Sequence, residues 1–255
     1  MAIFSLSYLD DPGLVFLQFC THADLRNLAD ILMTEKGSRR STEQLSDEPT
    51  FFASRDDLTK VWHLIAAELQ RFGADSVVTF FRGGKGVVYR EILTDVCGYL
   101  KIEIRDGEEF SAIESRVLLK ALEKSLEKMT EEERAEFVKS AAGMFANGQF
   151  NPAAATPAAI LAALQAAFAM GGFAAFQIAA IVANAVSKFI LGRGLAFAAN
   201  AGLMRVLGLV AGPFGFALSG ILSVPMISGA AYRVTVPAVI YVAYLRQKHI
   251  NRDLL

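Results

Sequence analysis

The chain has 255 residues, and its 26 Asp and Glu nearly balance its 25 Lys and Arg, giving a formal net charge of −1. Binding of nucleic-acid phosphates needs an excess of clustered Lys and Arg, so this balance argues against a general nucleic-acid binder. Hydrophobic residues make up 53% of the chain, which excludes intrinsic disorder and requires a large apolar area to be buried in a core or in lipid.

The charge is divided unevenly along the chain. Residues 1–139 carry a net charge of −7, and residues 140–255 carry a net charge of +6. Formal charges are missing from the 48 residues of 140–187 and from the 27 residues of 206–232. Ordinary globular chains are about 25% charged, so such runs are typical of buried helices or of membrane-seeking ones.

This division predicts an all-α protein, a multi-helix bundle with an amphipathic soluble half and a strongly apolar half. The acidic domain is expected over 1–140 and the apolar domain over 141–255. Within the acidic domain we predict a short helical hairpin over 1–34, a polar linker over 35–54 and a helical bundle over 55–140.

Helices are predicted within the bundle from apolar periodicity and from glycine breaks; they cover Asp56–Phe72, Tyr89–Leu100 and Ile113–Met129. Two capping boxes are also expected, in which each side chain satisfies a terminal backbone N–H. They pair Ser111 with Glu114 and Thr130 with Glu133.

The apolar half begins its first long helix at Thr156-Pro157, an N-cap followed by proline at the first helical position. A continuous helix from Ala158 to Ser187 would run about 45 Å and could cross a hydrocarbon layer of about 30 Å. Gly171-Gly172 in its middle favours two shorter helices instead. The last apolar segment, Val234–Leu245, is too short to span alone.

Small residues recur at every fourth position in Gly194, Ala198 and Gly202. This spacing lets another helix approach closely, so we expect any oligomerisation to use these residues. Three prolines, Pro213, Pro225 and Pro237, are also evenly spaced, and helix starts or kinks explain them as well as a repeat does.

Candidate chemical sites are few. Cys20 and His22 lie one residue apart and would point to different faces of a helix, so they predict no metal site. The two cysteines and the absence of a leading signal peptide are typical of a reducing compartment rather than a disulfide scaffold. We expect no catalytic residue, no cofactor, no metal and no enzymatic activity.

The most phosphate-like feature is a glycine-rich turn with two cations. Its residues are Arg82, Gly83, Gly84, Lys85 and Gly86. Exposed backbone N–H groups and nearby cations can form an anion nest. The spacing of a nucleotide-binding loop is missing, so a tight basic turn between two helices is the better interpretation, and an enzyme acting here is the third choice of function.

A helix that is apolar on all sides needs neighbours on all sides, and amphipathic helices offer one face each. We therefore expect the second half to contact a membrane lipid or a hydrophobic protein segment. The side chains expected at that contact are Phe168, Phe173, Phe176, Ile181, Leu209, Phe214 and Phe216. The side chains expected to meet lipid headgroups are Lys188, Arg193, Arg205 and Arg233.

Several stretches resemble the YaaW family of bacterial proteins. They include Tyr8-Leu-Asp-Asp-Pro, Glu68–Ser76, Tyr89–Leu93 and Ala230–Ala238. The central part of that family is similar to the ubiquinol-cytochrome c chaperones, helical factors that assist assembly of a membrane complex. The resemblance implies an all-helical fold and a binding role, and it supplies no catalytic residues. The Ala- and Phe-rich stretch 143–187 departs from the family pattern.

The expected function is non-enzymatic membrane association or conditional membrane insertion by the C-terminal helices, pore formation included. The alternative is a soluble assembly chaperone that holds hydrophobic client segments. The expected location is the bacterial cytoplasm, peripheral or integral to the inner membrane. Nucleic acid is not an expected partner.

Overall fold

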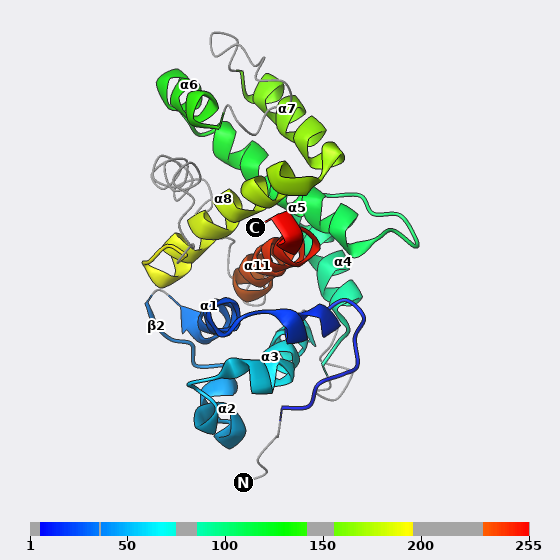
Figure 1. The fold of residues 1–255 in the computed structure, drawn as a ribbon, viewed down its shortest axis with the longest axis vertical. Coiled ribbons are helices and arrows are strands. Elements are labelled where there is room, and N and C mark those ends of the chain that lie inside the picture. The colour runs from blue at the N-terminus through cyan, green and yellow to red at the C-terminus, as the bar shows by residue number, and fades with distance from the viewer. Residues whose placement is uncertain (1–5, 36, 75–85, 142–155, 196–231, 255) are drawn as a thin grey trace.

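The computed structural model describes residues 6–35, 37–74, 86–141, 156–195 and 232–254 (Figure 1). Within these ranges the protein is all-α, as predicted, apart from one antiparallel pair of two-residue strands. Strand β1 (Thr34–Glu35) pairs with β2 (Ser38–Arg39), and Thr34 lies opposite Arg39.

The α-helices are, in chain order, α1 (His22–Met33), α2 (Pro49–Ala53), α3 (Trp62–Ala74), α4 (Tyr89–Leu100), α5 (Phe110–Leu126), α6 (Glu131–Ser140), α7 (Pro157–Met170), α8 (Gly172–Leu191) and α11 (Tyr232–Ile250). Short 3-10 helices are η1 (Val15–Phe19), η2 (Leu45–Asp47), η3 (Leu58–Val61) and η8 (Arg252–Leu254).

Local sequence signals set several helix ends. The capping box of Thr130 and Glu133 is confirmed, and Thr156 accepts a hydrogen bond from the backbone N–H of Ala159 at the start of α7. The expected box at Ser111 is wrong, because α5 begins two residues earlier than expected, with Glu109 as its N-cap. The carboxylate of Glu114 instead binds side chains of other helices.

The long uncharged segment is split into α7 and α8, as its glycines predicted. Gly171 and Gly172 have φ angles of +69° and +65°, in the left-handed region that glycine tolerates best. The chain therefore changes direction between the two helices, and α7 packs against both α5 and α8.

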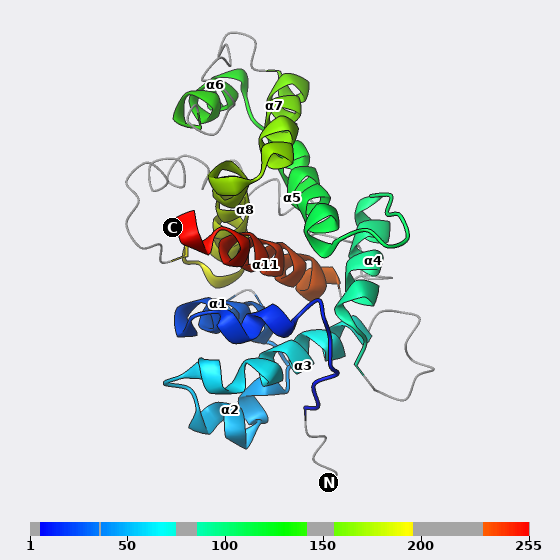
Figure 2. The ribbon, with the colours of Figure 1, turned by 45° about the vertical axis from the view of Figure 1, so that its right-hand side comes forward.

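The C-terminal helix α11 lies at the centre of the molecule (Figure 2). It packs against α1 and α3 on one side and against α5 and α8 on the other. It is longer than the predicted Val234–Leu245, and it continues through Pro237. Val236, Val239 and Ile240 are fully buried in it. One core cluster therefore contains residues from both the acidic and the apolar half.

The segment 35–54, expected to be a linker, carries the second strand, η2 and α2. Leu45 is fully buried there, and the side chains of Arg40 and Glu43 are also buried. Arg40 donates to the backbone carbonyls of Leu32 and Thr34, so this connection is fixed to the end of α1.

A close approach between α3 and the start of α4 depends on Gly73. A Cβ atom at this position would lie 2.4 Å from Ile92 Cγ1 and 2.9 Å from Val87 Cγ2. We expect Gly73→Ala to lower the free energy of unfolding by about 1–3 kcal/mol, because a packed core resists an added methyl group. Urea unfolding followed by circular dichroism measures this change.

Gly98 offers the matched control, since it also lies inside a helix and a Cβ there would meet nothing within 4 Å. We expect Gly98→Ala to raise stability by about 0.5–1 kcal/mol, because alanine loses less backbone entropy on folding. Equal effects of the two substitutions would show that α3 and α4 do not meet at Gly73.

Candidate functional site

Helix α7 is an uncharged helix with one side in the core and one side in solvent. Ile160, Leu164 and Ala167 are fully buried. The exposed side chains are Ala158, Ala162, Gln165, Ala166, Ala169 and Met170. A helix face without a charged residue is unusual next to water and is typical of a surface that contacts lipid or another protein.

Among the residues that the structure describes, α8 is the one helix long and apolar enough to span a membrane. Its 20 residues correspond to about 30 Å, whereas the 14 residues of α7 correspond to about 21 Å. Most of α8 is buried against α11, α5 and α1. The core helix of a water-soluble protein has the same length and composition, so these properties alone are weak evidence for membrane contact.

The described side chains that were expected to contact lipid or a hydrophobic partner differ in burial and do not form one exposed surface. Phe176 is 5% exposed with its ring centroid 5.9 Å from that of Tyr244, and Ile181 is 1% exposed. In this conformation both contact the protein's own core. Phe173 is half-buried beside Phe176, and Phe168 lines a cavity.

Other predicted residues lie outside the described ranges; they are Leu209, Phe214, Phe216, Arg205, Ala198 and Gly202, and Arg82, Gly83, Gly84 and Lys85 of the glycine-rich turn. Gly86 is described, and a Cβ there would lie 3.1 Å from Gln70 Cβ, so this glycine packs against α3. Gly194 also packs internally, because its Cβ would lie 2.7 Å from Asn184 Oδ1.

Two of the predicted headgroup cations, Arg193 and Arg233, lie near acidic side chains of the first half. Arg193 follows the end of α8 and forms an ion pair with Asp30 of α1, and it donates to Asn27 Oδ1 at 3.1 Å. Arg233, in the first turn of α11, lies 3.8 Å from Glu35. Lys188 is half-buried in the last turn of α8.

Two further ion pairs join the end of α11 to the first half. Lys248 Nζ lies 2.8 Å from Asp24 Oδ1, and Arg246 Nε lies 2.7 Å from Glu114 Oε2. Ion pairs between described residues thus join the halves at four places, each with the base in 140–255 and the acid in 1–139. Part of the charge difference between the halves is therefore paired within the molecule.

The Arg246–Glu114 pair belongs to a buried polar network. Glu114 is 1% exposed and also accepts a hydrogen bond of 2.8 Å from the hydroxyl of Tyr89. Arg246 donates to the backbone carbonyl of Gly13 at 2.6 Å, and its guanidinium lies 4.3 Å from the ring centroid of Phe16. The network therefore ties α4, α5 and the N-terminal segment to the end of α11.

Asp11 extends this network toward α3. One carboxylate oxygen accepts from the backbone N–H of Tyr89 at 2.6 Å, and the other accepts from that of Gly13 at 2.8 Å. Gln70 donates to Asp11 at 3.2 Å and exchanges two hydrogen bonds of 2.9 Å with the backbone of Leu9.

Burial sets the protonation of the network. It raises the pKa of Glu114, although the nearby Arg246 charge opposes this shift. Burial also raises the pKa of the Tyr89 hydroxyl well above its usual value, and the Glu114 charge adds to this effect. Tyr89 therefore stays a hydrogen-bond donor at neutral pH, which suits a structural network rather than proton transfer.

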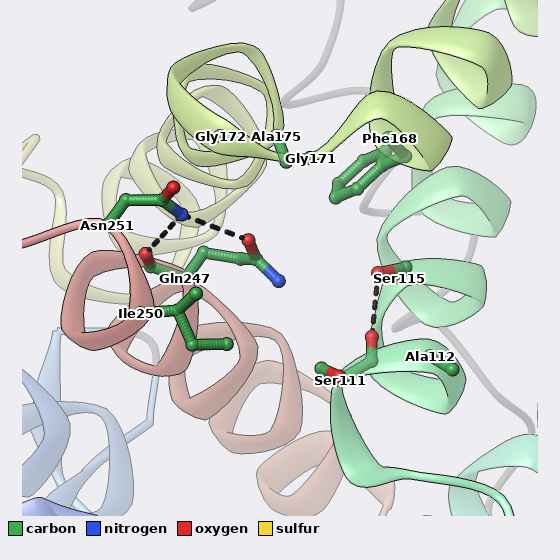
Figure 3. A pocket seen from close by; sticks show the side chains of 10 residues that line it. All are labelled: Ser111, Ala112, Ser115, Phe168, Gly171, Gly172, Ala175, Gln247, Ile250 and Asn251. Atoms are coloured by element: carbon green, nitrogen blue, oxygen red, sulfur yellow. Dashed lines mark hydrogen bonds between the residues drawn. The ribbon is translucent and has the colours of Figure 1, made fainter. Parts of the chain in front are cut away.

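A cavity of about 280 Å³ lies where α5, α7, α8 and the end of α11 meet (Figure 3). It is lined by Ser111, Ala112, Ser115, Phe168, Gly171, Gly172, Ala175, Gln247, Ile250 and Asn251. The side-chain amide of Asn251 donates to the backbone carbonyl of Gln247 at 2.8 Å. No titratable side chain lines the cavity, so its walls offer hydrogen bonds and apolar contact but no general acid or base.

The described ranges contain no group of three or more His, Cys, Asp or Glu placed to hold a metal ion. His22 has a structural role, because its Nδ1 accepts a hydrogen bond of 3.1 Å from the backbone N–H of Leu58 at the start of η3. Cys20 is half-buried and Cys97 is fully buried.

Sequence reasoning missed the pairing of Glu114 with Arg246, which lie 132 residues apart. The sequence does contain a signal for Glu114, one of the two partners. Glu114, Leu118 and Leu122 are spaced four residues apart, so the carboxylate lies on the apolar face of its helix. A charge in such a position needs a partner of opposite sign in the core.

Comparison with known proteins places the chain among similar bacterial sequences. It is 41% identical over 249 residues to a UPF0174 protein of Helicobacter pylori strain J99, covering 95% of this chain and 94% of that one. It is 32% identical over 247 residues to the UPF0174 protein YaaW of Escherichia coli K12, covering 95% and 97%. A domain of unknown function, DUF3944, matches residues 8–41. No solved structure matches the chain.

Removing Arg246, the cation of the buried network, tests how much the network contributes to the free energy of unfolding. We expect Arg246→Met to lower the free energy of unfolding by about 3–5 kcal/mol, because Glu114 is left as a buried charge without its partner. The double variant Arg246→Met, Glu114→Leu should lose less, since no unpaired charge remains. Urea unfolding at neutral pH compares the two, and a double variant as unstable as the single one contradicts this account.

The cysteines give a pH-dependent test. Burial raises the pKa of Cys20 to about 12 and that of Cys97 to about 11. Since only the thiolate reacts, we expect iodoacetamide near pH 8 to modify neither cysteine in the folded protein and both in guanidinium chloride. Mass spectrometry of the labelled protein measures this, and rapid labelling of the folded chain would contradict the burial of these thiols.

The raised pKa values of the two thiols also determine whether the free energy of unfolding rises or falls at alkaline pH. Unfolded thiols lose their protons above about pH 8.5, before the folded ones, so stability should fall as pH rises from there toward the folded pKa values. Cys97→Ala should reduce this decrease, as measured by urea midpoints at increasing pH.

Proposed function

This chain belongs to the UPF0174 family, which includes YaaW of Escherichia coli, and we propose that it is a non-enzymatic protein that associates with membranes through α7 and α8. In the proposal α7 makes the first contact with lipid. Helix α8 enters the lipid only when it leaves the core, so insertion is conditional. The location that follows is the cytoplasmic face of the bacterial inner membrane.

The observation that carries the proposal is the exposed side of α7. Four alanines and a methionine, with one glutamine, face solvent over the whole length of the helix, and neither an acidic nor a basic side chain interrupts them. Hydration of such an uncharged, mostly apolar surface is unfavourable. Its transfer to the lipid interface requires no desolvation of a charge.

Energetics favour a two-stage process. Each buried methyl or methylene group contributes about 0.8 kcal/mol, so the small alanine side chains make α7 a weak anchor by itself. Stable attachment would need the larger side chains of α8, such as Phe173, Phe176 and Ile181. These side chains are now turned toward the core, and α8 is long enough to cross the hydrocarbon layer.

A soluble assembly chaperone is the second candidate, and the cavity of Figure 3 favours it. Phe168 and the 56% exposed Ile250 line this cavity beside α7, so an apolar side chain of a client segment could occupy it. The similarity to ubiquinol-cytochrome c chaperones that the central region suggests belongs to this candidate. In both candidates the uncharged side of α7 is the contact surface.

A single charge on α7 tests the proposal without disturbing the core. We expect Ala166→Glu to reduce flotation of the purified protein with phospholipid vesicles about tenfold, because burying a carboxylate in the interface costs more than the alanine face gains. Ala23→Glu is the matched control, since it places the same exposed charge on α1. It should float like the unchanged protein.

The alternatives predict different results. Equal flotation of both variants would exclude α7 as the contact surface. If the unchanged protein does not float at all but prevents aggregation of an apolar model peptide, and Ala166→Glu loses that ability, the chaperone function is supported instead.

A further inference from the structure

We propose that the ion pair between Arg193 and Asp30 is a latch on the end of α8, and that anionic lipid headgroups open it by competing with Asp30 for Arg193. This inference rests on the membrane association proposed above. It adds the partner, an anionic membrane surface, and the contact that keeps α8 in the folded protein until that surface is met.

The four ion pairs between the halves differ in their access to water. The side chains of Arg246 and Glu114 are 11% and 1% exposed, and those of Lys248 and Asp24 are 35% and 9% exposed. The side chains of Arg193 and Asp30 are 53% and 22% exposed, and those of Arg233 and Glu35, which lie 3.8 Å apart, are 36% and 40% exposed. Exposed pairs are the weaker ones because water and salt screen them. The pair at the end of α8 is therefore far easier for a competitor to open than the pair at the end of α11.

The position of Arg193 makes it the tether of one end of α8. Helix α8 ends at Leu191, and Gly192 follows in the left-handed conformation with φ +69°. Arg193 then contacts both Asn27 and Asp30 on α1. At its other end α8 is continuous with the turn to α7 (Figure 1), so separation of Arg193 from α1 would loosen the end of α8 that is distant from α7, although packing of α8 against α1, β1 and α11 remains.

Burial of Asp30 opposes its pairing with Arg193. The pKa of Asp30 is raised, because partial burial of its carboxylate outweighs the attraction of Arg193 and Arg26. Desolvation thus disfavours the ionised carboxylate that the pair requires. A phosphate group at a membrane surface stays hydrated and binds arginine through two parallel hydrogen bonds, so it can replace this partner.

The neighbouring side chains suit a membrane surface. Phe189 is 41% exposed in the last turn of α8, and Lys188 precedes it. Lys188 and Arg193 have long aliphatic stems that can carry their charges to the level of lipid headgroups, and the exposed ring of Phe189 between them is apolar. The attraction of one basic residue to an anionic surface is of the same order as an exposed ion pair, so the competition is balanced.

The test uses vesicles of phosphatidylcholine alone and of phosphatidylcholine mixed with phosphatidylglycerol. We expect Asp30→Asn to bind the mixed vesicles about two- to fivefold more tightly than the unchanged protein, because the lipid no longer competes with a carboxylate. Arg193→Gln breaks the same pair but removes the cation, so it should gain less on the mixed vesicles than Asp30→Asn does. On phosphatidylcholine alone, which offers no anionic headgroup, the two variants should bind alike.

Asp47→Asn is the matched control. It makes the same change in net charge and breaks the exposed Arg39–Asp47 pair, which lies within the acidic half. If Asp47→Asn tightens binding as much as Asp30→Asn does, the effect is one of net charge and the latch is overturned.

A measurement made without lipid can test the latch independently of the proposed membrane association. Hydrogen exchange of the backbone amides in the last turn of α8 should be faster in Asp30→Asn and unchanged in Asp47→Asn. Unchanged exchange in Asp30→Asn overturns the latch even if the protein binds vesicles. If exchange becomes faster and no variant binds either kind of vesicle, the ion pair does hold α8, but membrane association and competition by lipid are both excluded.

Discussion

The structure depends on one constraint: a central helix from the basic half of the chain has to be enclosed by α8 of its own half and by helices of the acidic half. Helix α11 has apolar side chains on every side, and near its end it carries Arg246 and Lys248. Arg246 can be buried only because Glu114 is held opposite it. Ion pairs between the oppositely charged halves therefore help to hold residues of both halves in one core.

The segment that matches the domain of unknown function has a clear part in this assembly. Residues 8–41 contain Asp24, Asp30 and Glu35, which are the acids of three of the four ion pairs between the halves. They also contain Asp11, which holds the backbone N–H groups of Gly13 and Tyr89. The N-terminal segment thus covers the apolar helices with acidic side chains, and the Arg193–Asp30 pair is more exposed than the Lys248–Asp24 pair of the same segment.

Structural features that depend only on residues close together in the sequence were predictable. The caps at Thr130 and Thr156 and the break at Gly171-Gly172 are local, and local geometry decided them. The cap at Ser111 failed because a distant arginine and a tyrosine hydroxyl bind the Glu114 carboxylate, and a buried ion pair outweighs a terminal N–H. The ion pairs of Arg193 with Asp30 and of Arg233 with Glu35 were not predictable, since periodicity along the chain does not reveal which acids lie beside these cations.

The central position of α11 has a consequence for synthesis of the protein. A ribosome makes the chain from its N-terminus, and the helix around which the others pack is the last described α-helix to emerge. Until then α5 and α8 lack a neighbour against which both pack, and the uncharged run 140–187, which includes α7 and most of α8, can contact other molecules near the ribosome. Translation thus passes through an interval in which a nearby bilayer or a helper protein competes with the chain's own unfinished core.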